Sequence, residues 1–237
     1  MRLDIYLTET SLCKSRTAAQ SLIKSGGVSL NGIPCTKPSQ EVGASDTVDI
    51  IGEQLRYVGR GGLKLEAALD KFALDITGAK CIDIGSSTGG FTDCMLQHGA
   101  AKVWAVDVGR DQLDESLRRD PRVVSMEQTD IRTAELPQVD FIGTDVSFIS
   151  LKLILPHIYR LLKSGGRAAV LIKPQFEAGR PNLSKKGIVR DEKVRLRIRD
   201  EIAEFAQGCG FSVIGTETSP ITGGDGNTEY LMCLEKR

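Results

Sequence analysis

The segment CIDIGSSTGGF, residues 81–91, decides the fold of this chain. An apolar run that carries Asp83 at its end and passes into a glycine-rich turn indicates a strand followed by a helix. Gly85, Gly89 and Gly90 in that turn let a ligand approach the backbone, beside the exposed N–H groups of the helix start. The spacing is not the GxGxxG dinucleotide fingerprint, and the GK[ST] ending of a phosphate-binding P-loop is missing. The segment therefore predicts a ligand loop of another kind.

Two further acidic residues follow apolar runs downstream of this loop. Asp107 ends the run in WAVDVG, residues 104–109, where a carboxylate can take both hydroxyls of a ribose. Asp130 ends a third strand in VVSMEQTDI, residues 123–131, and could accept a hydrogen bond from an adenine amino group. The ends of such strands meet at the edge where open α/β sheets bind ligands. This pattern predicts a nucleoside cofactor without a pyrophosphate, and an NAD-dependent enzyme is the alternative.

The same segments resemble the S-adenosylmethionine (SAM) methyltransferase fold, because DIGSSTGGFTD, residues 83–93, is a close variant of its first motif. The resemblance implies that the loop cradles the methionine part of SAM, with Asp107 on the ribose and Asp130 on the adenine. The expected cofactor-binding residues are Asp83, Gly85, Ser86, Ser87, Thr88, Gly89, Gly90, Phe91, Asp107, Val108, Asp130 and Ile131.

From Leu63 onward, helical patterns alternate with short apolar runs, which is typical of βαβ units and a mostly parallel sheet. We expect an α/β, Rossmann-like domain with seven strands, at 81–85, 103–109, 123–126, 139–147, 167–173, 211–219 and 229–236. Helices are expected at 64–74, up to Gly99, at 112–120, up to Lys163 and at 191–206. The last helix should bury Val194, Ile198, Ile202 and Phe205, which recur at helical spacing.

The first part of the chain reads as a separate small unit. It predicts helices at 2–8 and from Ser15 or Thr17 to Lys24, strands at 28–30 and 47–51, and a tight turn at Asn31-Gly32. Residues 1–40 hold five basic and two acidic side chains, a net charge of +3. RLDIYL and SRTAAQSLIKSGGVSLNG, residues 2–7 and 15–32, resemble the S4 RNA-binding domain. The resemblance implies that Lys14, Arg16 and Lys24 contact structured RNA; the alternative is a helical hairpin with ordinary solvated charges.

The segment LRYVGRGG, residues 55–62, is the predicted linker because it combines three glycines with little periodicity. We therefore predict an S4-like α+β domain at 1–56, a linker at 57–62 and the methyltransferase domain at 63–237. Arg60 is predicted to bind RNA, and Lys185, Lys186 and Arg190 could extend the RNA-facing surface, since phosphate contacts need flexible cations.

Four segments place a charged residue among apolar ones: GGLKLEAAL with Lys64, IGTDVSFISL with Asp145, AVLIKPQFE with Lys173, and GNTEYLMCL with Glu229. Burying an ammonium is costly unless it is paired, so two lysines and two carboxylates in one pocket would satisfy each other. Their order resembles the Lys-Asp-Lys-Glu tetrad of FtsJ-like ribose 2′-O-methyltransferases. The resemblance implies that neutral Lys173 removes the proton of a ribose 2′-hydroxyl. It also implies that Asp145 and Glu229 orient the lysines and the hydroxyl, that Lys64 supplies positive charge beside the developing alkoxide, and that no metal is required.

Other methyl acceptors fit less well. Carbon-5 methylation of a pyrimidine needs a cysteine nucleophile, and the chain has no Pro-Cys dipeptide. Amino-group methylation usually shows Asn or Asp followed by Pro-Pro-aromatic, where this chain has TDVSFIS.

Together with KGIVRD and GDGNTEYL, at 186–191 and 224–231, these motifs resemble the TlyA family, often labelled hemolysin A. Members are taken to methylate cytidine 2′-hydroxyls of ribosomal RNA. The resemblance implies ribosomal RNA or ribosomal subunits as partners, with no membrane and no obligate protein partner. The alternatives are a non-catalytic RNA-binding assembly factor, a hemolysin-type membrane-active protein and a small-molecule methyltransferase.

Composition excludes several other classes. The 237 residues carry 31 basic and 31 acidic side chains, as an ordinary globular chain does. The longest apolar stretches, such as Ala168 to Ile172, are far shorter than the roughly 20 residues that span a bilayer. The six cysteines form no CxxC pair and only two histidines are present, so neither a disulfide framework nor a zinc site is predicted. We expect a protein of the reducing cytoplasm.

Overall fold

The computed structural model describes residues 1–13, 16–24, 26–51 and 56–237, so Lys14 lies outside the described residues. The chain divides into two compact units, Met1–Arg60 (unit 1) and Gly61–Arg237 (unit 2). The helix α3 (Gly61–Lys71) begins inside the segment predicted as a linker. Its buried residues Leu65 and Ala68 pack into unit 2 and outweigh the low helix propensity of Gly61 and Gly62. Gly61 and Gly62 therefore belong to the first turn of α3 and not to the linker that was predicted at 57–62.

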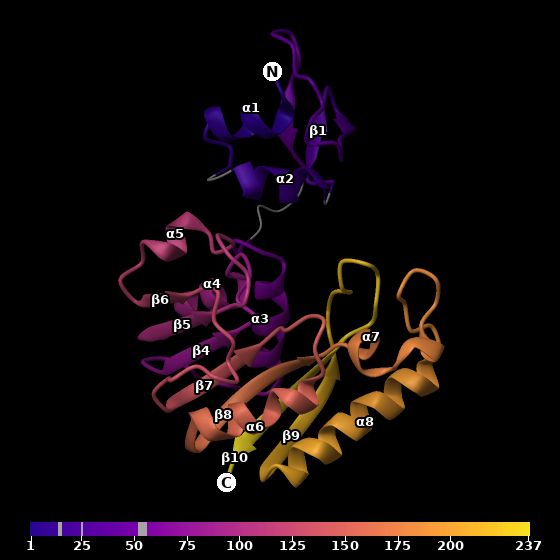
Figure 1. Cartoon of the computed structure of the whole chain (residues 1–237). Helices are drawn as coiled ribbons and strands as arrows, with labels where there is room; N and C mark the ends of the chain where they lie inside the picture. Colours follow the sequence, from indigo (N-terminus) through magenta and orange to yellow (C-terminus); the bar gives the residue numbers. More distant parts are fainter. Residues whose placement is uncertain (14–15, 25, 52–55) are drawn as a thin grey trace. The chain divides into compact units, whose positions relative to one another are not determined.

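Unit 1 places two helices, α1 (Leu3–Glu9) and α2 (Arg16–Lys24), with a small antiparallel sheet in the order β2-β1-β3 (Figure 1). The strands are β1 (Val28–Leu30), β2 (Ile33–Pro34) and β3 (Val48–Ile50). Asn31 and Gly32, both with positive φ, form the predicted tight turn between β1 and β2. The core of the unit consists of Leu3, Leu7, Ala19, Leu22, Ile23, Val28 and Val42.

Unit 2 is built on a seven-stranded sheet in the order β6-β5-β4-β7-β8-β10-β9, which confirms the predicted fold class. The strands are β4 (Lys80–Ile84), β5 (Lys102–Val106), β6 (Val123–Met126), β7 (Val139–Thr144), β8 (Leu162–Ile172), β9 (Phe211–Thr218) and β10 (Tyr230–Lys236). β10 runs antiparallel to both of its neighbours, whereas the other pairs are parallel. Lys163, predicted at the end of a helix, lies in β8, because the preceding helix ends at Leu161 and the strand pairs with β7 from Leu162.

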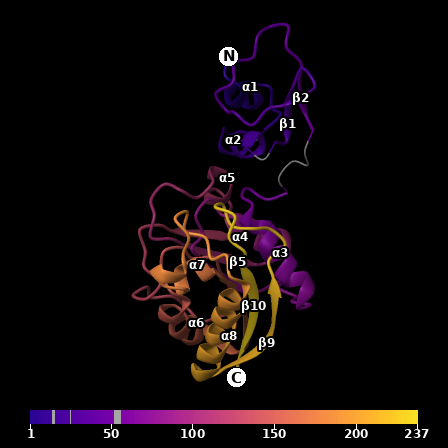
Figure 2. The ribbon, with the colours of Figure 1, turned by 90° about the vertical axis from the view of Figure 1, so that its right-hand side faces the viewer.

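Helices cover both faces of this sheet. α3 packs with α4 (Gly90–Gln97) on one face, and α6 (Leu155–Leu161) and α8 (Glu192–Gly208) lie on the other (Figures 1 and 2). α5 (Glu115–Arg118), α7 (Pro174–Glu177) and the 3-10 turns η1 (Leu151–Leu153) and η2 (Arg180–Asn182) belong to the connections. In α8, Ile198 and Ile202 are buried as predicted, but Val194 and Phe205 are only partly buried, because they lie at the margins of the face packed on the sheet. Within the described ranges, no helix is long and apolar enough to cross a bilayer.

The strand order reverses at β4, because β5 and β6 lie on one side of it and β7 and β8 on the other. At such a reversal the connections that leave the carboxyl ends of the two central strands diverge and open a crevice between them. The ligand loop predicted from the sequence follows β4 directly, so the fold positions it at this crevice.

Core packing under α8 can be tested with two isoleucines in unit 2. Ile202 is fully buried, whereas the Ile214 side chain on the edge strand β9 is 47% exposed. Ile202→Ala should lower the free energy of unfolding by about 3 kcal/mol through lost burial and a cavity, and Ile214→Ala by less than about 1 kcal/mol. Urea unfolding followed by the fluorescence of Trp104, the single tryptophan and a residue of β5, reports this unit. Equal losses would contradict the assigned packing.

Candidate active site

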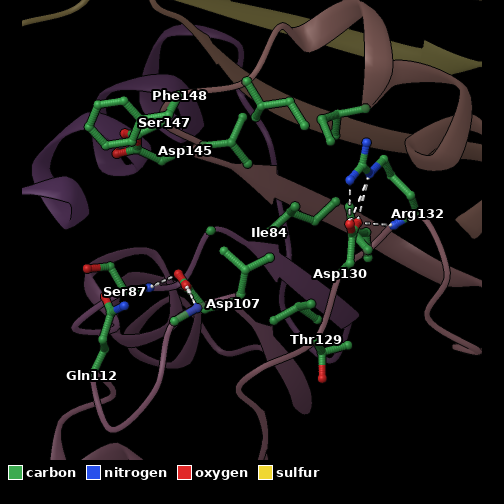
Figure 3. Close-up of a pocket in the computed structure, with 18 residues that line it drawn as sticks. Ile84, Ser87, Asp107, Gln112, Thr129, Asp130, Arg132, Asp145, Ser147 and Phe148 are labelled. Carbon is green, nitrogen blue, oxygen red and sulfur yellow. Dashed lines mark hydrogen bonds and ion pairs between the residues drawn. The ribbon is translucent and has the colours of Figure 1, made fainter.

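A cavity of ≈ 650 Å³ opens at the carboxyl ends of β4, β5 and β7 (Figure 3). Six predicted cofactor residues line it: Gly85, Ser87, Asp107, Val108, Asp130 and Ile131. Asp145, predicted to be catalytic, lines it too. The other lining residues were not predicted from the sequence: Ile84, Val106, Gly109, Gln112, Thr129, Arg132, Val146, Ser147, Phe148, Ile149 and Ile154. The remaining predicted cofactor residues, Asp83, Ser86, Thr88, Gly89, Gly90 and Phe91, lie outside this lining.

The loop after β4 has the shape that its glycines permit. Gly85 has φ +83°, and a Cβ at this position would lie 2.7 Å from the carbonyl oxygen of Asp145. The backbone N–H groups of Gly85 and Ser86 donate to the Val106 carbonyl, at 2.9 and 3.1 Å. Ser87, with φ 46°, also adopts the left-handed conformation. The loop thereby approaches the ends of β5 and β7 more closely than a side chain at position 85 would allow.

Asp83 lies behind the loop because successive strand residues face opposite ways, and its neighbour Ile84 lines the cavity. The Asp83 carboxyl is fully buried, and its Oδ2 accepts hydrogen bonds from the Thr92 backbone N–H (2.9 Å) and hydroxyl (2.7 Å). Its Oδ1 has no hydrogen-bond partner among the described residues. Burial raises the pKa of Asp83 to about 7, against the opposing effect of the Thr92 hydrogen bonds.

Asp107 directly follows β5 and joins two loops at the cavity (Figure 3). Its Oδ2 accepts from the Ser87 N–H at 2.8 Å, and its Oδ1 accepts from the Gly109 N–H at 2.7 Å. Each oxygen of a carboxylate accepts two hydrogen bonds, so both can still receive the hydroxyls of a ribose. The geometry suits the expected role, which remains a prediction.

Asp130 lies on the opposite side of the cavity from Asp145 in the close-up (Figure 3). It does not end a strand as predicted, since β6 stops at Met126, where its pairing with β5 ends, and Gln128 turns the chain with φ 54°. Both carboxylate oxygens accept from the Arg132 side chain, at 2.6 to 3.0 Å. This pairing holds the pKa of Asp130 down at about 2. Arg132 was not predicted, although a basic residue two positions after the carboxylate was a visible signal.

The four charged residues predicted as a tetrad meet in one cluster. The Lys64 side chain on α3 is 9% exposed, with its Nζ 2.6 Å from Glu229 and 3.6 Å from Asp145. The Lys173 Nζ is 2.5 Å from Asp145 Oδ1. Asp145 directly follows β7, Lys173 directly follows β8, and Glu229 directly precedes β10. Asp145 therefore joins the two lysines, and the carboxylates compensate the two ammonium groups.

Two residues of the loop after β7 extend this cluster and were missed from the sequence. The Lys173 Nζ donates to the Ser147 hydroxyl at 2.9 Å. Phe148, with φ 63°, is 90% exposed and lines the cavity, and its ring centroid lies 5.0 Å from that of Phe176. A bulky residue in the left-handed region is strained, and such strain is frequent at binding sites. The available signal was an aromatic residue in a polar segment just after a strand.

In unit 1, predicted RNA-binding Arg16 belongs to a cluster on the buried carboxylate of Asp4. Asp4 accepts from Arg2 at 2.9 and 3.0 Å, from Arg16 at 3.1 Å and from Gln20 at 2.8 Å. The Arg2 hydrogen bond is the main reason that the pKa of Asp4 is well below its ordinary value. Both guanidinium groups remain about half exposed, so Asp4 presents two cations side by side. Lys24, at the end of α2, is exposed, and Arg60 is the last residue of the unit.

Comparisons with known proteins agree over both units. A family model for FtsJ-like methyltransferases matches residues 57–236, and one for the S4 domain matches residues 1–48. The 16S/23S rRNA (cytidine-2′-O)-methyltransferase TlyA of Mycobacterium tuberculosis is 40% identical, over 98% of this chain and 89% of the relative. Hemolysin A of Brachyspira hyodysenteriae is 42% identical, over 98% of each chain. A solved structure from Streptococcus thermophilus has a TM-score of 0.79 and 46% identity, covering 100% of this chain and 88% of the other.

The buried Asp83 carboxyl should make stability depend on pH. Its pKa is about 7 in the folded chain and 3.8 in its ordinary state, so its stabilising effect is complete below about 3.8 and is lost as the pH rises through 7. In urea unfolding, the stability of the wild type relative to Asp83→Asn should fall by about 3 kcal/mol between pH 5 and pH 8. A difference that does not change with pH would refute the assignment.

Proposed function

The chain belongs to the FtsJ-like methyltransferase family, and we propose that it transfers the methyl group of SAM to a ribose 2′-hydroxyl of ribosomal RNA. The observation that carries the proposal is the cluster of Lys64, Asp145, Lys173 and Glu229 beside the cavity. Cytidine is the proposed nucleotide, because the relative from Mycobacterium tuberculosis is named for cytidine 2′-O-methylation. Ribosomal RNA as substrate also implies a cytoplasmic location.

The residues around the cavity fit SAM. Asp107 offers two carboxylate oxygens to a ribose, and Asp130 lies across the cavity from Asp145 where an adenine amino group can be received. The missing side chain at Gly85 lets the loop after β4 pack against the Asp145 backbone, since a Cβ there would lie 2.7 Å from the Asp145 carbonyl oxygen. A cavity of ≈ 650 Å³ lies within the usual range for sites that enclose a small molecule. When bound, SAM supplies an electrophilic methyl group on its sulfonium sulfur.

Each residue of the tetrad has a proposed role in the loss of the 2′-hydroxyl proton. Once its ammonium has lost a proton, Lys173 accepts the proton of the 2′-hydroxyl on Nζ, which Asp145 and Ser147 hold in place. As that proton leaves, negative charge develops on the ribose oxygen, and the ammonium of Lys64 stabilises it electrostatically. Glu229 and Asp145 keep Lys64 at this place, 2.6 and 3.6 Å from its Nζ. The cluster is preformed, so little reorganisation is needed during the reaction.

RNA binding is proposed for both units. In unit 1, the exposed guanidinium groups of Arg2 and Arg16 suit phosphate oxygens, which prefer forked, charge-assisted donors. In unit 2, the ring of Phe148 is exposed, and Phe148 directly follows Ser147, the hydrogen-bond partner of Lys173. This ring suits an unstacked base, because single nucleotides are commonly held by aromatic stacking. Lys14, Lys24 and Arg60 stay predicted RNA contacts.

A non-catalytic assembly factor and a membrane-active protein are the alternatives. The first would bind RNA through unit 1 and leave the tetrad unused, although burying Lys64 and Glu229 without a chemical role brings little stability. The second is suggested by the name of the Brachyspira relative. Purified protein free of detergent should not lyse red cells if the proposal is right.

The first test is methyl transfer from labelled SAM to separated ribosomal RNAs and subunits, followed by alkaline hydrolysis. Label in alkali-resistant dinucleotides establishes 2′-O-methylation, and label in mononucleotides means a methylated base. Lys173→Ala should lower kcat by about 10²-fold to 10⁴-fold, because a positioned base is lost, with SAM affinity retained. Lys71→Ala, at the other end of α3, is the control and should retain full activity. Wild-type protein without transfer on any rRNA assembly state would contradict the proposal.

The turn between η2 and α8 should contribute to RNA affinity and not to chemistry. Its side chains Lys185 and Lys186 are exposed, and the turn is held by buried Asn227, which accepts from the Val189 N–H and donates to the Gly187 carbonyl, both at 3.2 Å. Replacing both lysines by alanine should raise KM for RNA several-fold and reduce the slope of log KM against log salt by about two. The double change Lys71→Ala with Lys80→Ala is a matched control. An unchanged KM, or a loss of kcat alone, would show that Lys185 and Lys186 do not contribute to RNA binding.

A further inference from the structure

Glu177, the last residue of α7, connects two segments that carry the tetrad. Its Oε2 accepts a hydrogen bond from the Ser150 hydroxyl at 2.6 Å, and its Oε1 accepts from the Leu151 backbone N–H at 2.7 Å. Glu177 follows Lys173 by four residues, and Ser150 follows Asp145 by five. The carboxylate therefore ties the segment after β8 to the segment after β7.

Three contacts in succession join these segments. In order along the two segments, the Lys173 Nζ contacts Asp145 and Ser147 (the front contact), and the rings of Phe176 and Phe148 pack together (the middle contact). Glu177 then binds Ser150 and Leu151 (the rear contact). The front contact holds groups that must move a proton and meet a substrate, and the middle contact involves a highly exposed ring. The rear contact is the one built from a partly buried carboxylate with two short hydrogen bonds.

The segment that carries Lys173 has little rigidity of its own. Lys173 directly follows β8 and precedes α7, which is a single helical turn of four residues, Pro174–Glu177. So short a helix is not stable by itself and depends on its tertiary contacts. Ser150 in turn caps η1, because its hydroxyl accepts from the Lys152 N–H at 3.2 Å. The Glu177 carboxylate thus joins the end of one short turn to the beginning of another.

We propose that Glu177 is a positioning residue for methyl transfer: it holds the segment of Lys173 against the segment of Asp145, Ser147 and Phe148. This inference rests on the proposed function. Without the rear contact the Lys173 to Asp145 ion pair can persist, but its position relative to the ribose is no longer fixed. A displacement of about 1 Å in a catalytic group can cost on the order of 10²-fold in rate.

The test compares Glu177→Ala with Glu177→Gln in the full chain, by steady-state methyl transfer to rRNA and by SAM binding. Alanine should lower kcat by about 10-fold to 10²-fold. The Kd for SAM should stay within about twofold, because Glu177 does not line the cavity. Glutamine keeps an oxygen for the Leu151 N–H and an amide group for the Ser150 hydroxyl, so it should recover most of kcat.

Two further variants separate positioning from a general loss of stability. Glu235→Ala is the control: it removes the ion pair of Glu235 with Arg167 across β10 and β8 (2.8 Å). This pair lies at the other end of β10 from Glu229, so kcat should be unchanged. Ser150→Ala removes one of the two hydrogen bonds to Glu177, together with the cap on the Lys152 N–H, and leaves the Leu151 bond in place. Its kcat should lie between those of the wild type and Glu177→Ala, even if the latter folds poorly. Wild-type kcat in Glu177→Ala, or no recovery with glutamine, would overturn the inference while the wild type still transfers methyl groups. A wild type without transfer would instead refute the proposed function.

Discussion

The ammonium of Lys64 is the group on which the arrangement of unit 2 depends. It is buried, and a buried charge is tolerated only where opposite charges compensate it. Its partners come from distant parts of the chain: Asp145 follows β7, and Glu229 precedes β10, 165 residues after Lys64. α3, β7 and β10 must therefore meet at one place for the charge to be satisfied. The same meeting point is the edge of the sheet where the cavity opens.

The antiparallel strand β10 makes this meeting possible. In a parallel sheet all strands reach the ligand-binding edge at their carboxyl ends. β10 runs the other way, and its first residue, Tyr230, pairs with Ile172, the last residue of β8. Glu229 and Lys173 therefore arrive at the same edge from opposite chain directions. A fully parallel sheet would place a residue that precedes the last strand at the opposite edge.

The sequence predicts those parts of the fold and the site that depend on periodicity or on charge in an apolar setting. Lys64, Asp145, Lys173 and Glu229 stood out because each lies within or at the end of an apolar segment, and the strands were found from their apolar character. Ser147 and Glu177 did not stand out, because polar residues are ordinary in loops and only tertiary structure shows their partners. Arg132 differs, because its partner Asp130 lies only two residues away and the pairing is visible in the sequence. The glycines at the start of α3 were misinterpreted for a related reason, since the packing that holds them in a helix is not local.

The central claim is that the four charged side chains act as one unit, through contacts of Lys64 and Asp145 in the middle. Glu229 and Lys173 are the ends of this chain of contacts, so a double-mutant cycle on kcat with Glu229→Gln, Lys173→Met and both together tests it most directly. If the four side chains act together, the loss of kcat in the double variant is close to that of the more damaging single change. If the two losses multiply, the residues act independently and the account is contradicted.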